Sequence, residues 1–151
     1  IGVIEYFDLF IKDNFSEDKT KQIIDKFKSE NPQINIYYLK GDGKHFANSY
    51  IYGLHQISKE YLYYAFCDQD DIWENYHLER SIKYFKNNNN KPAVYCSRTK
   101  LINEKGEIIG KSIHFKKPAS FQNALVQSIA GANTMIFNYQ AFNILKKLNL
   151  N

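Results

Sequence analysis

The sequence predicts an α/β domain in which a mostly parallel sheet is flanked by helices and followed by a β-hairpin. Three observations predict this class. Short apolar runs typical of strands alternate with segments whose apolar residues recur at helical spacing. The run Tyr61–Cys67 is continuously apolar, as a central parallel strand is. Later in the chain, two short apolar runs flank Glu104-Lys105-Gly106, which indicates a hairpin.

The first strand is predicted at Phe7–Ile11 and the first helix directly after it. Ser16 is a plausible N-cap, with Glu17 and Asp18 in the first helical turn. Asn31-Pro32 ends the helix, because the residue before proline is pushed out of the helical region. The apolar face of this helix follows the i, i+3, i+4, i+7 spacing and comprises Thr20, Ile23, Ile24 and Phe27.

The next two β-α steps follow the same alternation. Ile34–Leu39 is a second strand and Gly41–Gly43 a turn, and Tyr61–Cys67 is the strongest strand candidate. One predicted helix lies between these two strands, and another lies between Tyr61–Cys67 and the loop Asn87–Asn90. Their apolar faces comprise Phe46, Tyr50, Leu54 and Ile57 in the earlier helix, and Leu78, Ile82 and Phe85 in the later one.

After that loop the pattern changes. Ala93–Cys96 is a short strand, and Leu101–Asn103 with Glu107–Ile109 forms the hairpin. Ser120 caps a short helix that carries Phe121, Ala124, Leu125 and Ser128 on one face. The remaining predicted elements are a strand at Asn133–Phe137 and a helix at Tyr139–Leu148.

Length and composition set further bounds. The 151 residues, of which 44% are apolar and 16% aromatic, fit one domain spanning 1–151 with a sizeable core. No run approaches the roughly 20 apolar residues of a membrane span, and Ile1–Phe10 lacks the marks of a signal peptide. The net charge of +4 comes mostly from dispersed lysines, so no nucleic-acid partner is predicted. Cys67 and Cys96 lie in apolar runs and are predicted to be buried free thiols of a reducing compartment.

Two acidic motifs follow predicted strands, and the carboxyl ends of parallel strands are where such sheets bind ligands. One is Asp13–Asp18 and the other is Asp68–Asp71. Three carboxylates within four residues repel one another unless a cation neutralises them. On an extended loop, Asp68 and Asp70 aim their oxygens toward one point, which suits Mg²⁺ or Mn²⁺. The alternative is a solvated acidic loop in which Asp71 caps a helix beginning near Glu74.

The octapeptide Phe66–Trp73 (FCDQDDIW) resembles the Asp-Gln-Asp-Asp-x-Trp form of the DXD motif in family 2 glycosyltransferases, closest to their rhamnosyltransferase-like branch. Three other segments are similar to motifs of that family in the same order. Asp13–Thr20 resembles its first acidic motif, Gly43–Asn48 its Gly-x-x-x-Asn segment, and Ala130–Asn138 its Gly-x-x-Thr-x-x-Phe-Asn element. The similarity extends from about Phe7 to Asn143.

The resemblance implies a GT-A fold, Rossmann-like in its sheet, and a metal-dependent, inverting glycosyltransferase. The donor would be a nucleotide diphosphate sugar, UDP- or dTDP-linked. The acceptor would be a saccharide or lipid-linked saccharide of cell-surface polysaccharide or glycolipid synthesis. The implied location is cytoplasmic, at the inner face of the cell membrane through peripheral association. The implied cofactor is Mg²⁺ or Mn²⁺.

By the same resemblance, the nucleotide-binding residues would be Asp13, which contacts the pyrimidine base, with Ser16, Asn48 and Asp68. Asp70 would ligate the metal at the diphosphate, together with Asp68. The donor or acceptor site would include Asp71, Trp73 and Thr134. From the residues alone, the favoured interpretation is a packing anchor for Trp73 and an ordinary strand residue for Thr134.

Two parts of the family pattern are not found in this sequence. Nothing before Phe7 matches the Thr-Tyr-Asn-like turn of the nucleotide pocket, and no Asp or Glu between Ser112 and Asn151 offers a general base. The chain is therefore expected to be a partial domain. The main alternative is a non-catalytic nucleotide-sugar-binding or scaffolding module. A DXD-type phosphohydrolase is disfavoured, because Ile72 and the lack of a second acid pair depart from its pattern.

Overall fold

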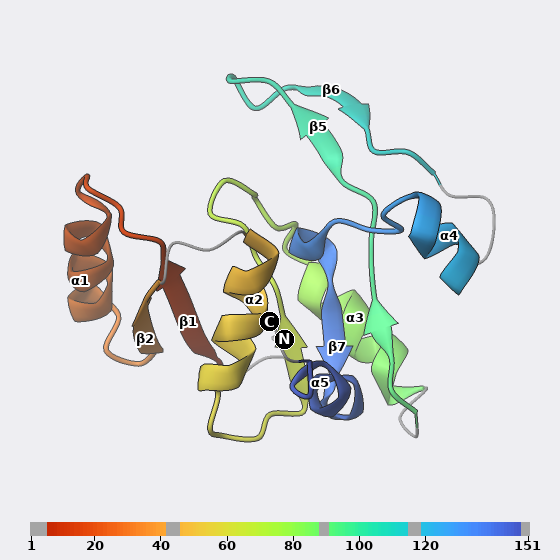
Figure 1. Ribbon diagram of the computed structural model, residues 1–151. Coiled ribbons are helices and arrows are strands. Elements are labelled where there is room, and N and C mark those ends of the chain that lie inside the picture. Colours follow the sequence, from red (N-terminus) through yellow and green to blue (C-terminus); the bar gives the residue numbers. More distant parts are fainter. Residues whose placement is uncertain (1–5, 42–45, 88–90, 115–118, 149–151) are drawn as a thin grey trace. The chain divides into compact units, whose positions relative to one another are not determined.

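The computed structural model describes residues 6–41, 46–87, 91–114 and 119–148 (Figure 1). The chain forms two compact units. Unit 1 comprises Ile1–Glu60 and Asn143–Asn151, and unit 2 comprises Tyr61–Phe142. No helix in the described ranges is long and apolar enough to cross a membrane.

Unit 1 is built on a parallel pair of strands. β1 (Asp8–Asp13) and β2 (Asn35–Lys40) pair in continuous register, from Asp8 opposite Asn35 to Asp13 opposite Lys40. The crossover helix is α1 (Thr20–Glu30), and α2 (Phe46–Gln56) follows β2. The two predicted strands are confirmed within two residues. The buried core of this unit includes Ile24, Ile36, Leu54 and Ile57.

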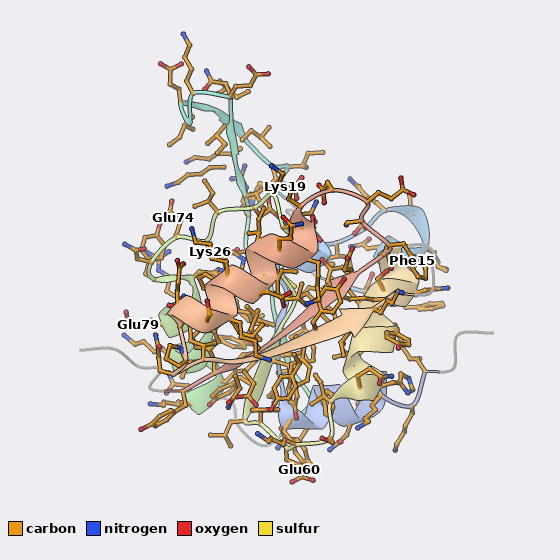
Figure 2. The ribbon with its side chains drawn as sticks, turned by 90° about the vertical axis from the view of Figure 1, so that its left-hand side faces the viewer. Phe15, Lys19, Lys26, Glu60, Glu74 and Glu79 are labelled. Carbon is orange, nitrogen blue, oxygen red and sulfur yellow. The ribbon has the colours of Figure 1, made fainter. Side chains whose placement is uncertain are left out.

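The start of α1 differs from the prediction. Phe15 adopts a left-handed conformation, with φ of 63°, on the loop ahead of α1 (Figure 2). Ser16 hydrogen-bonds to Asp13 instead of capping the helix. The helix begins four residues later, and Asp18 accepts hydrogen bonds from the backbone N–H and the hydroxyl of Thr20 at 2.9 and 2.5 Å. The prediction of Ser16 as N-cap is therefore wrong, because its hydroxyl is already bound.

The predicted apolar face of α1 is only partly buried. Ile24 is buried, whereas Ile23 is 65% exposed and Phe27 is also exposed. A two-stranded sheet is too narrow to cover the whole predicted stripe. The C-terminal end of the helix agrees with the prediction, since α1 stops at Glu30 with Asn31 at the C-cap.

Unit 2 contains an antiparallel sheet of three strands in the order β3-β7-β4. These are β3 (Tyr63–Ala65), β7 (Ile136–Asn138) and β4 (Val94–Tyr95). The prediction of a mostly parallel sheet is thus met only by β1 and β2 among the described strands. The run Tyr61–Cys67 supplies just three strand residues and is not a parallel strand. Leu62, within the run, is exposed, so the run lacks the two covered faces that the pattern predicts.

The core of unit 2 is aromatic. Tyr64 stacks on Phe137 and Phe142, with ring centroids 5.7 and 3.9 Å apart, and Phe85 stacks on Tyr63 at 5.3 Å. Phe85 lies on α3 (His77–Lys86), which confirms the predicted third helix. α5 (Tyr139–Leu145) begins directly after β7 and stops three residues before the predicted end.

The hairpin is confirmed. β5 (Lys100–Ile102) pairs with β6 (Ile108–Lys111), and Figure 1 shows it extending away from the three-stranded sheet of unit 2. Gly106 has φ of +79° in the turn, a conformation that glycine adopts without strain. Its N–H donates to the carbonyl of Asn103 at 2.9 Å.

Three further predictions from the second half have mixed outcomes. Ser120 caps α4 (Phe121–Val126) by accepting from the N–H of Asn123 at 3.2 Å, as predicted, but Phe121 and Leu125 are 74% and 70% exposed. The predicted strand Asn133–Phe137 divides into a 3₁₀ helix, η1 (Ala132–Thr134), and β7. Parts of the turn Gly41–Gly43 and of the loop Asn87–Asn90 fall outside the described residues.

Both cysteines are exposed, so the prediction of buried thiols is wrong. The strands β3 and β4 end at Ala65 and Tyr95, before each cysteine is reached. Cys67 and Cys96 therefore leave the sheet, although partial desolvation still raises the pKa of both thiols.

Candidate functional site

In unit 1, the polar site is built around Asp13, the last residue of β1. Its side chain is buried, with 7% of the residue exposed. Oδ1 accepts from the backbone N–H and the hydroxyl of Ser16, at 2.9 and 2.5 Å, and Oδ2 accepts from the hydroxyl of Tyr38 at 2.5 Å. These bonds, led by the one from the Ser16 hydroxyl, lower the pKa of Asp13 because they stabilise the carboxylate form.

The backbone beside Asp13 requires a glycine. The N–H of Gly41 donates to the carbonyl of Asp13 at 2.6 Å, and a Cβ at position 41 would come within 3.0 Å of that oxygen and of Asn14. Asn14 also donates to the hydroxyl of Ser49 on α2 at 3.0 Å. Asn48 is half-buried and lies next to Ser49 on α2. Unit 1 therefore brings together Asp13 and Ser16 by direct contact and ties the end of β1 to the helix that carries Asn48.

In unit 2, the carboxylates follow β3 in a tight turn. The N–H of Asp71 donates to the carbonyl of Asp68 at 3.4 Å, which closes a four-residue turn. The prediction of an extended loop is wrong, because this bond brings positions 68 and 71 together. Asp68 is half-buried, whereas Asp70 and Asp71 are exposed.

The turn is attached to the segment Gly131–Met135. The N–H of Phe66 donates to the carbonyl of Met135 at 3.1 Å. The side-chain amide of Asn133 donates to Asp71, and the indole N–H of Trp73 donates to the carbonyl of Asn133 at 3.3 Å. Asp71 does not cap a helix, since α3 begins at His77 with Tyr76 at the N-cap.

The structure thus brings Asp71 and Trp73 together around Asn133, a residue that the sequence analysis did not select. The only signal for it was its place between Gly131 and Thr134 in the Ala130–Asn138 motif. Thr134 is buried in η1, and its hydroxyl donates to the carbonyl of Gly131 at 3.0 Å. Thr134 is therefore not a strand residue, and its hydroxyl supports the local turn. Trp73 is half-buried against the ring of His77, with centroids 5.1 Å apart, which supports its role as a packing anchor.

A divalent cation is the cofactor that the aspartate turn would accept. In the described part of the chain, no three His, Cys, Asp or Glu side chains converge on one point. Mg²⁺ in nucleotide sites is commonly held by only one or two carboxylates, with phosphate oxygens and water completing its shell. Asp68 and Asp70 would supply two hard oxygen ligands within a single turn, so the residues present fit such an ion.

Comparisons with known proteins agree with these motifs. The family model described as glycosyl transferase family 2 matches residues 4–147. The chain is 24% identical, over 134 residues, to a Bacillus subtilis (strain 168) protein provisionally assigned as the teichuronic acid biosynthesis glycosyltransferase TuaG. The match covers 88% of this chain and 51% of TuaG, so the chain spans about half the length of that relative. No solved structure matches the chain. Because the family model covers nearly the whole sequence, the chain belongs to glycosyl transferase family 2.

Proposed function

We propose that the protein transfers a sugar, with inversion, from a UDP- or dTDP-sugar to a hydroxyl of a saccharide or lipid-linked saccharide. The process would be the synthesis of cell-surface polysaccharide or glycolipid. The observation that carries the proposal is the Asp68–Asp71 turn, held at the end of β3 in a chain that belongs to this family. The relative's assignment to teichuronic acid synthesis supports the choice of a surface polysaccharide.

The donor base is proposed from the state of Asp13. Both lone pairs of Oδ1 are used by Ser16, whereas among the described residues Oδ2 accepts one bond, from Tyr38. The lowered pKa keeps the group ionised, so it can only accept a hydrogen bond. Uracil and thymine carry a ring N–H that can donate to the remaining lone pair, which favours UDP and dTDP donors. Replacing Asp13 with Ala should accordingly weaken UDP binding more than pyrophosphate binding.

The cation is proposed to be held by Asp68 and Asp70 together with the donor diphosphate. When bound, Mg²⁺ or Mn²⁺ would stabilise the negative charge that gathers on the leaving diphosphate. Asp70 is exposed and can turn toward an incoming ion without breaking a packed core. A neutral side chain at position 70 would remove one of the two carboxylates.

The decisive experiment is a transfer assay with UDP- and dTDP-sugars, Mn²⁺ and candidate saccharide acceptors. Nucleoside diphosphate released only when metal and acceptor are both present would support the proposal, and NMR of the product would report inversion. Nucleotide binding without any release would instead support the non-catalytic binding module. Inorganic phosphate as the released product would support the phosphohydrolase and contradict the proposal.

Peripheral membrane association is proposed from the hairpin region of unit 2. The segment 97–119 contains six basic and two acidic residues. The rest of the chain contains 14 basic and 14 acidic residues. The lysines are spread along the chain but are matched by acids elsewhere, so the excess of positive charge falls in this segment, of which residues 115–118 lie outside the described structure. Its hairpin also exposes aliphatic side chains, namely Leu101, Ile102, Ile108 and Ile109, and Ile113 follows it. Exposed aliphatic groups among excess cations suit the anionic inner face of a cell membrane.

A further inference from the structure

Asn133 contacts two separate parts of the aspartate motif. Its side-chain amide donates to the Asp71 carboxylate, and its backbone carbonyl accepts from the indole of Trp73. A third hydrogen bond runs from the N–H of Phe66, ahead of the turn, to the carbonyl of Met135. The residues Asp68 and Asp70 therefore lie between two points that are both fixed to one short segment.

The closing backbone bond of the turn, from Asp71 to Asp68, is long at 3.4 Å, and Asp70 and Asp71 are exposed. The thiol of Cys67 also donates to the carbonyl of Asp68 at 3.3 Å. The 3₁₀ segment opposite is well ordered by its own bonds, with the N–H groups of Thr134 and Met135 donating at 3.1 and 2.9 Å. We propose that Asn133 is a positioning residue that sets the geometry of the Asp68–Asp71 turn for cation binding. This inference rests on the function proposed above.

A neutral amide suits this task better than a cationic side chain. Three adjacent carboxylates repel one another, and a hydrogen bond to Asp71 stabilises one of them. Lysine or arginine at position 133 would also bind Asp71, but its positive charge would oppose a divalent cation at Asp68 and Asp70. Asn133 thus holds Asp71 to the protein while leaving the negative charge of the turn intact.

A substitution at Gly131 offers a second way to disturb the contact between Asn133 and Asp71. A Cβ at position 131 would come within 3.0 Å of Asn133 Oδ1, a side-chain atom at the end of a flexible group. The backbone at Gly131, with φ of −68° and ψ of 141°, is one that alanine adopts freely. Gly131→Ala should therefore displace the Asn133 side chain at little cost in backbone strain. The glycine is needed for the amide position and not for the chain conformation.

The test measures UDP binding by calorimetry with and without Mn²⁺, in Asn133→Ala, Gly131→Ala and the double variant. We expect each single variant to weaken Mn²⁺-dependent binding by about 10-fold, as is typical of residues that orient metal ligands. The double variant should be no weaker than the worse single variant, because both changes remove one contact. Binding of UDP without metal and the melting temperature should stay close to wild type, which a merely structural role would not predict.

Two control substitutions match the chemistry of the changes. Asn75→Ala removes an exposed amide near Trp73 in sequence, and Gly110→Ala adds a methyl group in ordinary contact, 3.5 Å from Leu101. Both should bind UDP as wild type does.

Asp70→Ala separates the inference from the function on which it rests. If Asp70→Ala loses Mn²⁺-dependent binding while Asn133→Ala and Gly131→Ala retain it, the positioning role is overturned and the proposed function stands. If the wild-type protein shows no Mn²⁺-dependent binding, both are overturned. Additive losses in the double variant would also contradict a single shared contact.

Discussion

The two units hold their carboxylates in opposite ways. In unit 1, Asp13 is buried and accepts three hydrogen bonds from Ser16 and Tyr38, and its pKa is lowered. In unit 2, Asp70 is exposed on a turn that is attached to the protein through its neighbours. One carboxylate is thus part of the fold, whereas the other faces solvent.

This difference separates stability from binding. A buried carboxylate with three donors contributes to folding, because its removal leaves those donors without a partner. An exposed carboxylate among other acids contributes little to folding and is available to a cation. Substitution of Asp13 should therefore lower stability in addition to its proposed effect on base binding, whereas substitutions on the exposed face of unit 2 should lower ligand affinity alone.

The largest effect is expected for Asp70→Ala. Loss of one of two carboxylate ligands should weaken Mn²⁺-dependent UDP binding by more than about 100-fold. This exceeds the loss of affinity usually seen when a residue that only orients a metal ligand is replaced. The melting temperature should not fall, because the side chain is exposed. Calorimetry and thermal unfolding test both points, with the exposed Glu104→Gln as the matched control. Unchanged metal-dependent affinity would contradict the assignment of Asp70.

The next effect concerns the lysines of segment 97–119, which includes the hairpin of unit 2. Lys105→Gln combined with Lys111→Gln should weaken binding to vesicles containing anionic phospholipid by about 10-fold or more, since each lysine near such a surface is worth about 1 kcal/mol. Co-sedimentation with anionic and with neutral vesicles measures this. Lys83→Gln combined with Lys86→Gln on α3 removes the same charge elsewhere and should bind normally. Equal losses in the two double variants would argue for total charge and against a hairpin surface.

The elements that the sequence predicts well are those fixed by local chemistry. The hairpin has a glycine where the turn needs positive φ, and Ser120 caps α4 with its own hydroxyl. β1 and β2 agree within two residues because their apolar runs are bounded by polar turns. These features depend on residues only a few positions away in the sequence. Hydrophobic periodicity and turn residues therefore predict them directly.

The features that the sequence predicts poorly depend on distant partners. Ser16 is a good N-cap by type, but Asp13 takes its hydroxyl. The run Tyr61–Cys67 is apolar enough for a parallel strand, yet its partner β7 is antiparallel and more than 70 residues away. Asn133 is recognised as a site residue only from its hydrogen bonds with Asp71 and Trp73 in the structure. The acidic motifs themselves were found from sequence, whereas the residue that orders one of them was not.

A smaller effect, now on stability, is expected for Asp13→Asn. The variant should lose about 2 kcal/mol of unfolding free energy at pH 7, because hydrogen bonds to a charged group are replaced by weaker ones. The pKa of Asp13 is lowered on folding, so its stabilisation is present above about pH 4 and is lost as the pH falls through the folded value. The difference between wild type and variant should therefore shrink in acid. Urea unfolding from pH 7 to pH 3 measures this, with exposed Glu17→Gln as control. A constant difference would show that the charge is not the cause.

The smallest effect is expected for Tyr38→Phe, which removes one of the three donors to Asp13 and keeps the aromatic ring. The loss should be smaller than that of Asp13→Asn, because only one of the three hydrogen bonds is removed. The two bonds from Ser16 remain, so the pKa of Asp13 should rise only part of the way toward its ordinary value. NMR titration of the carboxyl and urea unfolding measure the two quantities, and Tyr76→Phe, at an exposed ring, is the control. A loss as large as that of Asp13→Asn would mean that the Tyr38 hydroxyl supplies nearly all of the stabilisation, and a carboxylate held jointly by Ser16 and Tyr38 would no longer explain why unit 1 differs from unit 2.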